Sequence, residues 1–270
     1  MNSKPRYRIA VDSKLAAGTS VTLIGNAAHY LTHVLRLKEG DAMALFNRTD
    51  GEWFARLGYA KKREVTLNVE ILLKKPSVPV GLTVCFAPIK GGRLETIIEK
   101  ATELGASVLQ PVITNRTIVD KVNVERAEAI AKEAAEQCER TDWPVINSPI
   151  KLLPFLGSWP QDVPLIYGDE SGASSSIVEG DSPLRFADPS GSGWDPTQGK
   201  PKKWGILVGP EGGFTAEEFA ALKHLKAARG VSLGPRILRA DTAVITLCAL
   251  TLAAWGDWDQ RPRFEKDAAV

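Results

Sequence analysis

Two glycine-containing loops near the C-terminus constrain this chain more than any other feature. The first reads Gly-Pro-Glu-Gly-Gly over residues 209–213, and the second reads Leu-Gly-Pro-Arg-Ile-Leu-Arg-Ala-Asp-Thr over residues 233–242. Each follows an apolar run typical of a β-strand (204–208 and 231–233) and precedes a run typical of a helix. In α/β proteins the carboxyl ends of parallel strands open into a crevice in which small molecules bind. The loops therefore predict an α/β fold with a ligand site at that edge.

The residues of the two loops indicate the kind of ligand. Glycine lets bare backbone approach a ligand closely, so such loops offer N–H groups and carbonyl oxygens more than charges. Neither loop is a phosphate-binding P-loop, because Gly212-Gly213 is followed by Phe214-Thr215 in place of Lys-Ser/Thr, and the chain has no G-x-G-x-x-G string. The loops thus suit a neutral, nucleoside-like cofactor.

From residue 81 onward, apolar strand-like runs alternate with helix-like runs. We expect strands at 81–89, 106–114, 164–167 and 205–208, and helices at 93–104, 124–140, 215–229 and 241–255. Gly105 is placed to end the first of these helices, and Thr215 with Glu218 has the spacing of a capping box. This alternation predicts a mainly parallel sheet with helices on both faces.

The first 75 residues follow a different pattern. Short strand-like runs lie at 6–11, 21–24, 42–46, 52–59 and 65–73, with a short helix at 27–36. The pattern, with its Asp50-Gly51 hairpin signal, predicts a small β-barrel that residues 74–79 link to the α/β part. This portion holds 13 Lys and Arg against 7 Asp and Glu, although the whole chain has a net charge of only +2. Such an asymmetry indicates nucleic-acid contact, or a basic but merely solvated surface.

The two loops also resemble the hallmark strings of a known family. Leu-Val-Gly-Pro-Glu-Gly-Gly from Leu207 and Leu-Gly-Pro-Arg-Ile-Leu-Arg from Leu233 are typical of the SPOUT methyltransferases that act on uracil N3 in 16S ribosomal RNA. The string GRLETIIEKATELG over 92–105 matches that family too, as does Glu-Gln-Cys from Glu136 with Arg140. The strings occur in the family's order across nearly the whole chain.

This resemblance implies a fold, a reaction and partners. The fold would be a SPOUT-type α/β domain with a C-terminal trefoil knot over residues 80–260, preceded by a PUA-like RNA-binding β-barrel over residues 1–75. The reaction would be methylation of a uridine at N3 with S-adenosylmethionine as cofactor, on ribosomal RNA or the small ribosomal subunit. The alternatives are a SPOUT enzyme acting on a ribose 2′-oxygen or a transfer RNA base, and a non-catalytic RNA-binding protein.

Two features depart from the family's pattern. The family usually has Glu where this chain has Asp241, which shortens the side chain in a loop expected near the substrate. The Ser/Gly/Pro-rich stretch 171–203 is also longer than expected. We expect it to form a mobile loop, either an inert insertion or a lid.

The resemblance assigns the cofactor to residues of both loops. They are Gly209, Glu211, Gly212, Gly213, Leu233, Gly234, Pro235 and Leu238. Glu211 could bind a cofactor hydroxyl, or could favour the positive N-terminus of the next helix. Asp169-Glu170 could line the same site or form a solvated turn.

Arg236, Arg239 and Asp241 are the candidate catalytic residues. A guanidinium stays charged and presents a fork of donors, so either Arg could pair with uracil oxygens or stabilise an N3 anion. The alternative for the arginines is a phosphate contact or an ion pair with Asp241. Asp241 itself could accept the N3 proton or cap the last helix.

The candidate RNA contacts are basic residues of the N-terminal portion, namely Arg6, Arg8, Arg36, Lys61, Lys62 and Arg63. His29 and His33 have the spacing of ligands on a metal-binding helix, but the chain lacks the Glu of H-E-x-x-H there. We therefore expect no metal site.

Composition indicates where the protein works. The chain has three widely separated cysteines and no C-x-x-C, which favours neither zinc nor disulfides. Its first ten residues lack the apolar core of a signal peptide, and the longest apolar run, 243–255, is too short to span a bilayer. We expect a cytoplasmic protein, and a homodimer whose interface includes the last helix, because that helix is apolar nearly all round.

Overall fold

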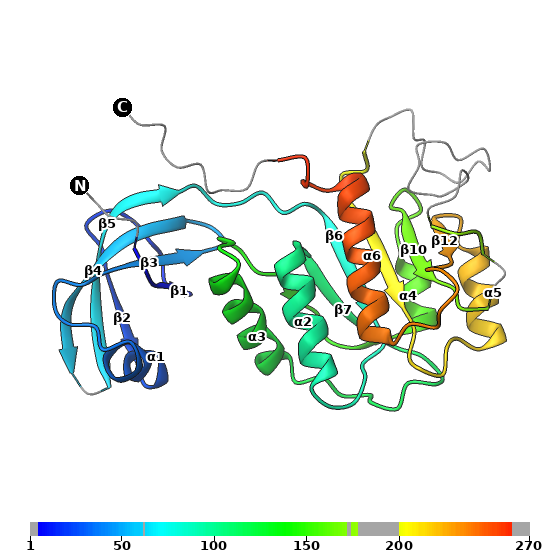
Figure 1. Ribbon diagram of the computed structural model, residues 1–270, viewed down its shortest axis with the longest axis horizontal. Helices are drawn as coiled ribbons and strands as arrows, with labels where there is room; N and C mark the ends of the chain where they lie inside the picture. The colour runs from blue at the N-terminus through cyan, green and yellow to red at the C-terminus, as the bar shows by residue number, and fades with distance from the viewer. Residues whose placement is uncertain (1–4, 62, 172–173, 178–199, 261–270) are drawn as a thin grey trace. The chain divides into compact units, whose positions relative to one another are not determined.

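The computed structural model describes residues 5–61, 63–171, 174–177 and 200–260, and its chain divides into two compact units (Figure 1). The first unit consists of Met1–Val78 with Lys132–Trp143, and the second consists of Pro79–Ala131 with Pro144–Val270. The sequence pattern placed a boundary after residue 75. It gave no sign that residues 132–143 pack with the N-terminal portion.

One five-stranded sheet organises the first unit. Its order is β1 (Arg8–Ala10), β3 (Ala42–Asn47), β4 (Gly51–Lys61), β5 (Glu64–Lys74) and β2 (Ser20–Ile24). β1 is parallel to β3, and the other neighbours are antiparallel. The expected helix at 27–36 is the short α1 (Asn26–His29) followed by one π-helical turn, η1 (Tyr30–Val34). Alternate strand residues such as Met43, Leu45, Val65 and Leu67 fill the core of the unit.

The predicted Asp-Gly turn joins β3 to β4. Asn47 Oδ1 accepts hydrogen bonds from the N–H groups of Thr49 (3.0 Å) and Asp50 (2.6 Å). Gly51 then adopts φ = +82°, and a Cβ at that position would collide with the carbonyl oxygen of Lys74. Glycine is therefore required here both by its left-handed backbone and by the neighbouring strand.

Arg8 is not available to RNA in the structure, because its side chain is buried. Only 6% of the side chain is exposed, and Nη2 pairs with Glu52 Oε2 at 3.0 Å. The guanidinium also donates to the carbonyl oxygens of Ala135 (3.1 Å), Glu136 (2.8 Å) and Arg140 (2.7 Å), where α3 (Val124–Gln137) ends. Arg8 thus donates to carbonyl oxygens at and just after the C-terminal end of α3, and ties residues 132–143 to the sheet of this unit.

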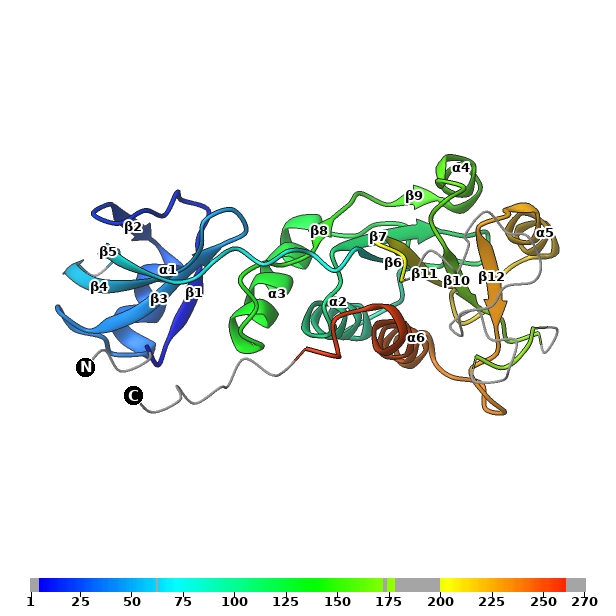
Figure 2. The same cartoon turned by 90° about the horizontal axis from the view of Figure 1, so that it is seen from above.

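The second unit contains a parallel sheet between two layers of helices. Its strand order is β12 (Ala228–Val231), β10 (Leu165–Gly168), β11 (Trp204–Val208), β6 (Leu82–Phe86), β7 (Val108–Ile113) and β8 (Val145–Ile146), and β9 (Ile150–Lys151) also pairs with β7. Every one of these strand pairs is parallel. α2 (Arg93–Leu104) and α6 (Ala240–Trp255) cover one face, whereas α4 (Leu152–Ser158) and α5 (Ala216–His224) cover the other (Figure 2). The predicted α/β fold is confirmed.

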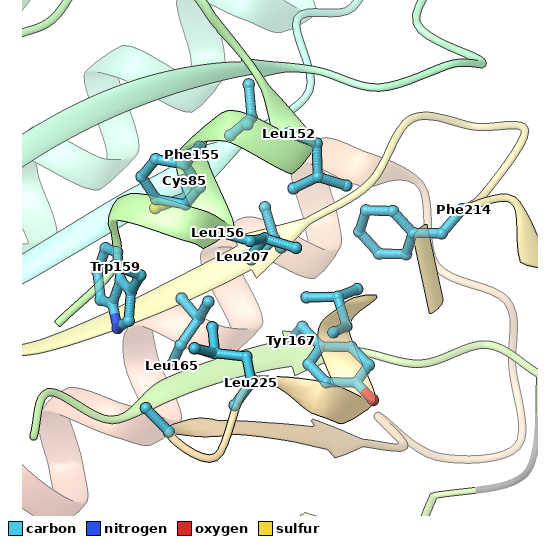
Figure 3. Packing of buried hydrophobic residues seen from close by; sticks show 14 residues of the cluster. Cys85, Leu152, Phe155, Leu156, Trp159, Leu165, Tyr167, Leu207, Phe214 and Leu225 are labelled. Atoms are coloured by element: carbon cyan, nitrogen blue, oxygen red, sulfur yellow. The ribbon is translucent and has the colours of Figure 1, made fainter. Parts of the chain in front are cut away.

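A large apolar cluster holds α4 and α5 against this sheet (Figure 3). Leu165 of β10 and Leu207 of β11 belong to this cluster together with Phe155 and Leu156 of α4, and Trp159 follows at the end of that helix. Burial raises the pKa of the Cys85 thiol within the same cluster, so this cysteine stays protonated and serves as a packing residue.

Local pattern misjudged several elements of this unit. The expected helix 215–229 ends at His224, and Ala228 begins a strand instead, because β12 pairs with β10 along the sheet edge. β8, β9 and α4 were not expected at all. Most of the expected loop at 171–203 lies outside the described residues, although its described residue Ile177 is buried.

Candidate functional site

Three strands of the second unit end side by side, and the loops that follow them enclose a cavity. β10 is parallel to both β11 and β12, so these strands finish at the same edge of the sheet. The cavity has a volume of about 340 Å³, within the range of small-molecule sites. Its wall consists of residues 168–170, 208–211, 213–214, 219, 231–240 and 243. Both Gly-Pro loops therefore face one cavity.

Seven of the eight predicted cofactor residues line this cavity; the exception is Gly212. Gly212 turns toward the loop after β7, where its carbonyl oxygen accepts a hydrogen bond from Arg116 Nη1 at 2.7 Å. A Cβ on Gly212 would lie 3.4 Å from the Arg116 side chain. Gly212 thus belongs to the outer support of the first loop.

Glycine is required by the backbone at one position in each loop. Gly213 has φ = +66°, and a Cβ there would collide with the carboxylate of Glu170. Gly234 has φ = +102°, and no heavy atom lies within 4 Å of where its Cβ would be. Both conformations are left-handed and cost an L-residue free energy, so the sequence places glycine where each loop turns along the cavity.

Glu218 holds the first loop in place from behind the cavity. Its side chain is buried, and Oε2 accepts from the Thr215 N–H (2.8 Å) while Thr215 Oγ1 accepts from the Glu218 N–H (3.3 Å), which confirms the predicted capping box. Oε1 accepts from the Asn115 N–H at 2.7 Å. One carboxylate therefore joins the start of α5 to the loop after β7, which also carries Arg116.

Asp169 places a negative charge at the cavity wall. Burial raises the pKa of its carboxyl group, but hydrogen bonds from Ser171 and Ser174 outweigh that effect and bring the pKa below its usual range. The Ser171 N–H donates to Oδ1 at 2.9 Å, and the Ser174 hydroxyl donates to Oδ2 at 2.6 Å. Asp169 is therefore ionised at neutral pH.

Glu211 forms an exposed ion pair with Arg93 of α2 (3.2 Å) beside the cavity. α5 begins only after its N-cap residue Thr215, and the acidic residues of its first turn are Glu217 and Glu218. Glu211 is therefore not one of the acidic residues of that first turn, and its carboxylate pairs with Arg93 instead.

Arg236 and Arg239 both line the cavity and are exposed to solvent. Neither makes an ion pair with another residue of the described ranges, so the ion pair with Asp241, which was the alternative to a catalytic role, does not form there. Asp241 lies outside the cavity wall, as the second residue of α6. The cap hypothesis for Asp241 is wrong, because the N-cap position belongs to Arg239 and Asp241 Oδ1 instead accepts from the Thr242 N–H at 3.0 Å.

Four of the predicted RNA contacts are exposed on the first unit, namely Arg6, Arg36, Lys61 and Arg63; Lys62 lies outside the described residues. Lys61 Nζ lies 5.3 Å from the centre of the Tyr59 ring, and a hydrogen bond with Tyr59 raises the pKa of Lys61. Over the residues that the structure describes, no group of three or more His, Cys, Asp or Glu could hold a metal ion. In the same residues, no helix is long and apolar enough to cross a membrane.

Sequence reasoning missed several residues of the wall, including Phe219 of α5 and Ala243 of α6. Phe219 packs edge-on against Phe214 of the first loop, with ring centres 5.4 Å apart. Both helices follow the Gly-Pro loops directly, so the side chains of their first turn or two are the ones that can face the ligand. The signal in the sequence that could have found Phe219 and Ala243 was their place in the first turns of the helix that follows each loop.

Comparisons with known proteins agree with this arrangement. A family model described as an RNA methyltransferase domain matches residues 76–252, and one described as an RNA methyltransferase PUA domain matches residues 23–70. The ribosomal RNA small subunit methyltransferase E of Rickettsia conorii is 35% identical over 243 residues, which cover 90% of this chain and 93% of that protein.

Solved structures agree as well. A methyltransferase of Legionella pneumophila, determined with bound S-adenosylmethionine, is 27% identical with a TM-score of 0.78 and covers 92% of this chain and 97% of its own. The ribosomal RNA small subunit methyltransferase E of Neisseria gonorrhoeae, bound to S-adenosylmethionine, is 26% identical with a TM-score of 0.77 and covers 93% of this chain and 99% of its own.

The match of the α/β part and of the N-terminal part to the two family models makes the chain an RNA methyltransferase. The chain belongs to the family of the ribosomal RNA small subunit methyltransferases E.

The role of Glu218 yields a stability prediction. Glu218→Gln replaces one acceptor oxygen by an NH₂ group that faces a backbone N–H, so we expect the free energy of unfolding to fall by about 1–3 kcal/mol. Glu217→Gln, an exposed change one residue away, is the matched control and should shift it by less than about 0.5 kcal/mol. Urea unfolding measures both. Equal effects of the two changes would contradict the bracing role of Glu218.

Proposed function

We propose that this protein transfers a methyl group from S-adenosylmethionine to N3 of a uridine in small-subunit ribosomal RNA. The observation that carries the proposal is the meeting of both Gly-Pro loops around one cavity, with two exposed arginines at the same wall. The loops are the strings that resemble the uracil-N3 enzymes. The Rickettsia relative, by its name, methylates small-subunit ribosomal RNA, which supports the choice of substrate.

We assign the cavity to S-adenosylmethionine. The residues present suit it, because Val208, Leu233 and Leu238 offer an apolar wall for an adenosyl group while Asp169 and Glu170 offer carboxylates for its positive groups. Two similar structures contain that cofactor. When bound, it supplies an activated methyl group on a sulfonium centre. The chain itself binds and orients both reactants, and such positioning supplies much of the rate.

Arg236 and Arg239 act on the uracil. The N3–H proton must leave, and negative charge then spreads over N3 and the adjacent carbonyl oxygens. A guanidinium at the cavity wall that is not held by another described residue can donate to those oxygens and stabilise the anion. Asp241 lies outside the wall, so solvent takes the proton.

The first unit positions the RNA through its phosphates. Arg6, Arg36, Lys61 and Arg63 are exposed there, and the PUA model covers most of this region. Phosphate contacts of this kind fix the register of the RNA and leave recognition of the base to the cavity.

The assembly is a homodimer, and the C-terminal part of the chain forms a trefoil knot. α6 supports the dimer, because Ile245 and Ala249 of this apolar helix stay partly exposed and Ala253 is exposed. The knot follows from the resemblance of the loop strings to SPOUT enzymes. A ribosomal substrate supports a location in the cytoplasm.

The product tests the proposed function. Small-subunit ribosomal RNA from a strain that lacks this protein should lose N3-methyluridine at one position, and expression of the wild-type chain should restore it. Mass-spectrometric analysis of nucleosides measures both. An unchanged N3-methyluridine level, or loss of a 2′-O-methyl nucleoside in its place, would contradict the proposal.

The cofactor assignment can be tested by filling the cavity. Ala243→Leu adds three carbon atoms at the wall, so we expect the affinity for S-adenosylmethionine to fall roughly tenfold or more by calorimetric titration. Ala220→Leu makes the same change at an exposed position of α5 and should leave the affinity unchanged. Wild-type affinity in a folded Ala243→Leu protein would place the cofactor elsewhere.

The arginines can be tested by turnover. Arg→Ala at the residue that stabilises the anion should lower the rate of methylation by roughly 10²–10³, the usual loss for one charge-stabilising donor, with cofactor affinity kept. Arg→Lys at the same position should restore little, since an ammonium lacks the planar fork. If Arg236→Ala and Arg239→Ala both turn over at the wild-type rate, neither residue has the proposed role.

A further inference from the structure

We propose that Ile237 is a wedge that enters the RNA stack in place of the target uracil when that base turns into the cavity. The proposal rests on the function proposed above and adds to it a positioning residue for the unstacked nucleotide. It identifies the substrate form as RNA in which the target base is stacked before it binds.

The position of Ile237 carries the argument. The residue is 84% exposed, yet it lines the cavity wall together with Arg236 before it and Arg239 two residues after it. Single exposed aliphatic side chains are ordinary on protein surfaces. Ile118 is an example, with 74% exposed and no place in the cavity wall. Ile237 differs because it is an apolar group between two cations at the wall of the proposed active site.

The combination of an exposed aliphatic side chain with two arginines favours RNA as the molecule that contacts this part of the cavity wall. A base turned into the cavity would meet Arg236 and Arg239 at its wall, and the apolar faces of the bases that it leaves behind would meet Ile237. Proteins insert such aliphatic groups between bases to hold a stack open. Turning a base out costs a few kcal/mol, so a side chain that fills the gap lowers the barrier to reaching the cavity.

The local backbone suits a rigid wedge. Pro235 has a fixed φ angle two residues before Ile237, and α6 begins three residues after it, at Ala240. Leu238 is only partly exposed, which anchors the loop beside the wedge. A β-branched side chain is stiff at χ1, so Ile237 keeps its direction without a partner.

Two RNA hairpins of small-subunit sequence provide the test, with the target uridine either paired with adenine or bulged out. Ile237→Ala should slow methylation of the paired hairpin roughly 10- to 100-fold and that of the bulged hairpin far less, because a bulged base has already left the stack. Ile237→Leu should restore most of the rate. Ile118→Ala is the matched control and should leave both rates unchanged.

A second readout follows the base itself. With 2-aminopurine next to the target, wild-type protein should raise the fluorescence of the paired hairpin on binding, and Ile237→Ala should not. The wedge is overturned if Ile237→Ala slows methylation of both hairpins equally, or if this variant raises the fluorescence as much as the wild-type protein does. If light scattering gives Ile237→Ala a lower molar mass than the wild-type protein, Ile237 belongs to a contact between copies of the chain and is not a wedge. Absence of N3-methyluridine after wild-type protein acts on small ribosomal subunits from the deletion strain would count against the proposed function, not the wedge.

Discussion

Parallel pairing of β10 with both β11 and β12 is the constraint on which the rest of the site depends. It brings three chain segments that are far apart in sequence to one edge, where the loops after Gly168, Val208 and Val231 must share the same space. Two of those loops turn through left-handed glycines, Gly213 and Gly234, and both glycines lie in the cavity wall. The result is a cavity suited to a nucleoside-like molecule more than to a free phosphate.

Support for the cavity comes from behind it. Glu218 and Arg116 fasten the first loop to the loop after β7, so the wall is fixed before any ligand binds. Asp169 is fixed in the same way by two serines. By contrast, Arg236 and Arg239 make no ion pair within the described residues, which leaves their charges free to act on a substrate. The groups that shape the cavity are therefore fixed by hydrogen bonds to neighbouring residues, whereas the two arginines proposed to meet the RNA make no ion pair with the described residues.

Sequence patterns predicted correctly those features that depend on interactions between residues close together in the chain. The helix at Arg93–Leu104 and the capping box of Thr215 with Glu218 were predicted correctly, since both depend on residues a few positions apart. The helix expected up to residue 229 failed because β12 forms through pairing with β10, which no local pattern contains. Burial of Arg8 was missed for the same reason, because its partners lie some 44 to 132 residues away. The strand-end position of both loops predicted most of the cavity wall, but not the contributions of Phe219 and Ala243.

A crystal structure of the chain with S-adenosylmethionine would show whether the two Gly-Pro loops hold the cofactor. We expect the adenosyl group between the loops at 209–213 and 233–238, with the sulfonium methyl group facing the side of the cavity that carries Arg236 and Arg239. Electron density for the cofactor at any other place on the second unit, or a methyl group that faces away from both arginines, would contradict it.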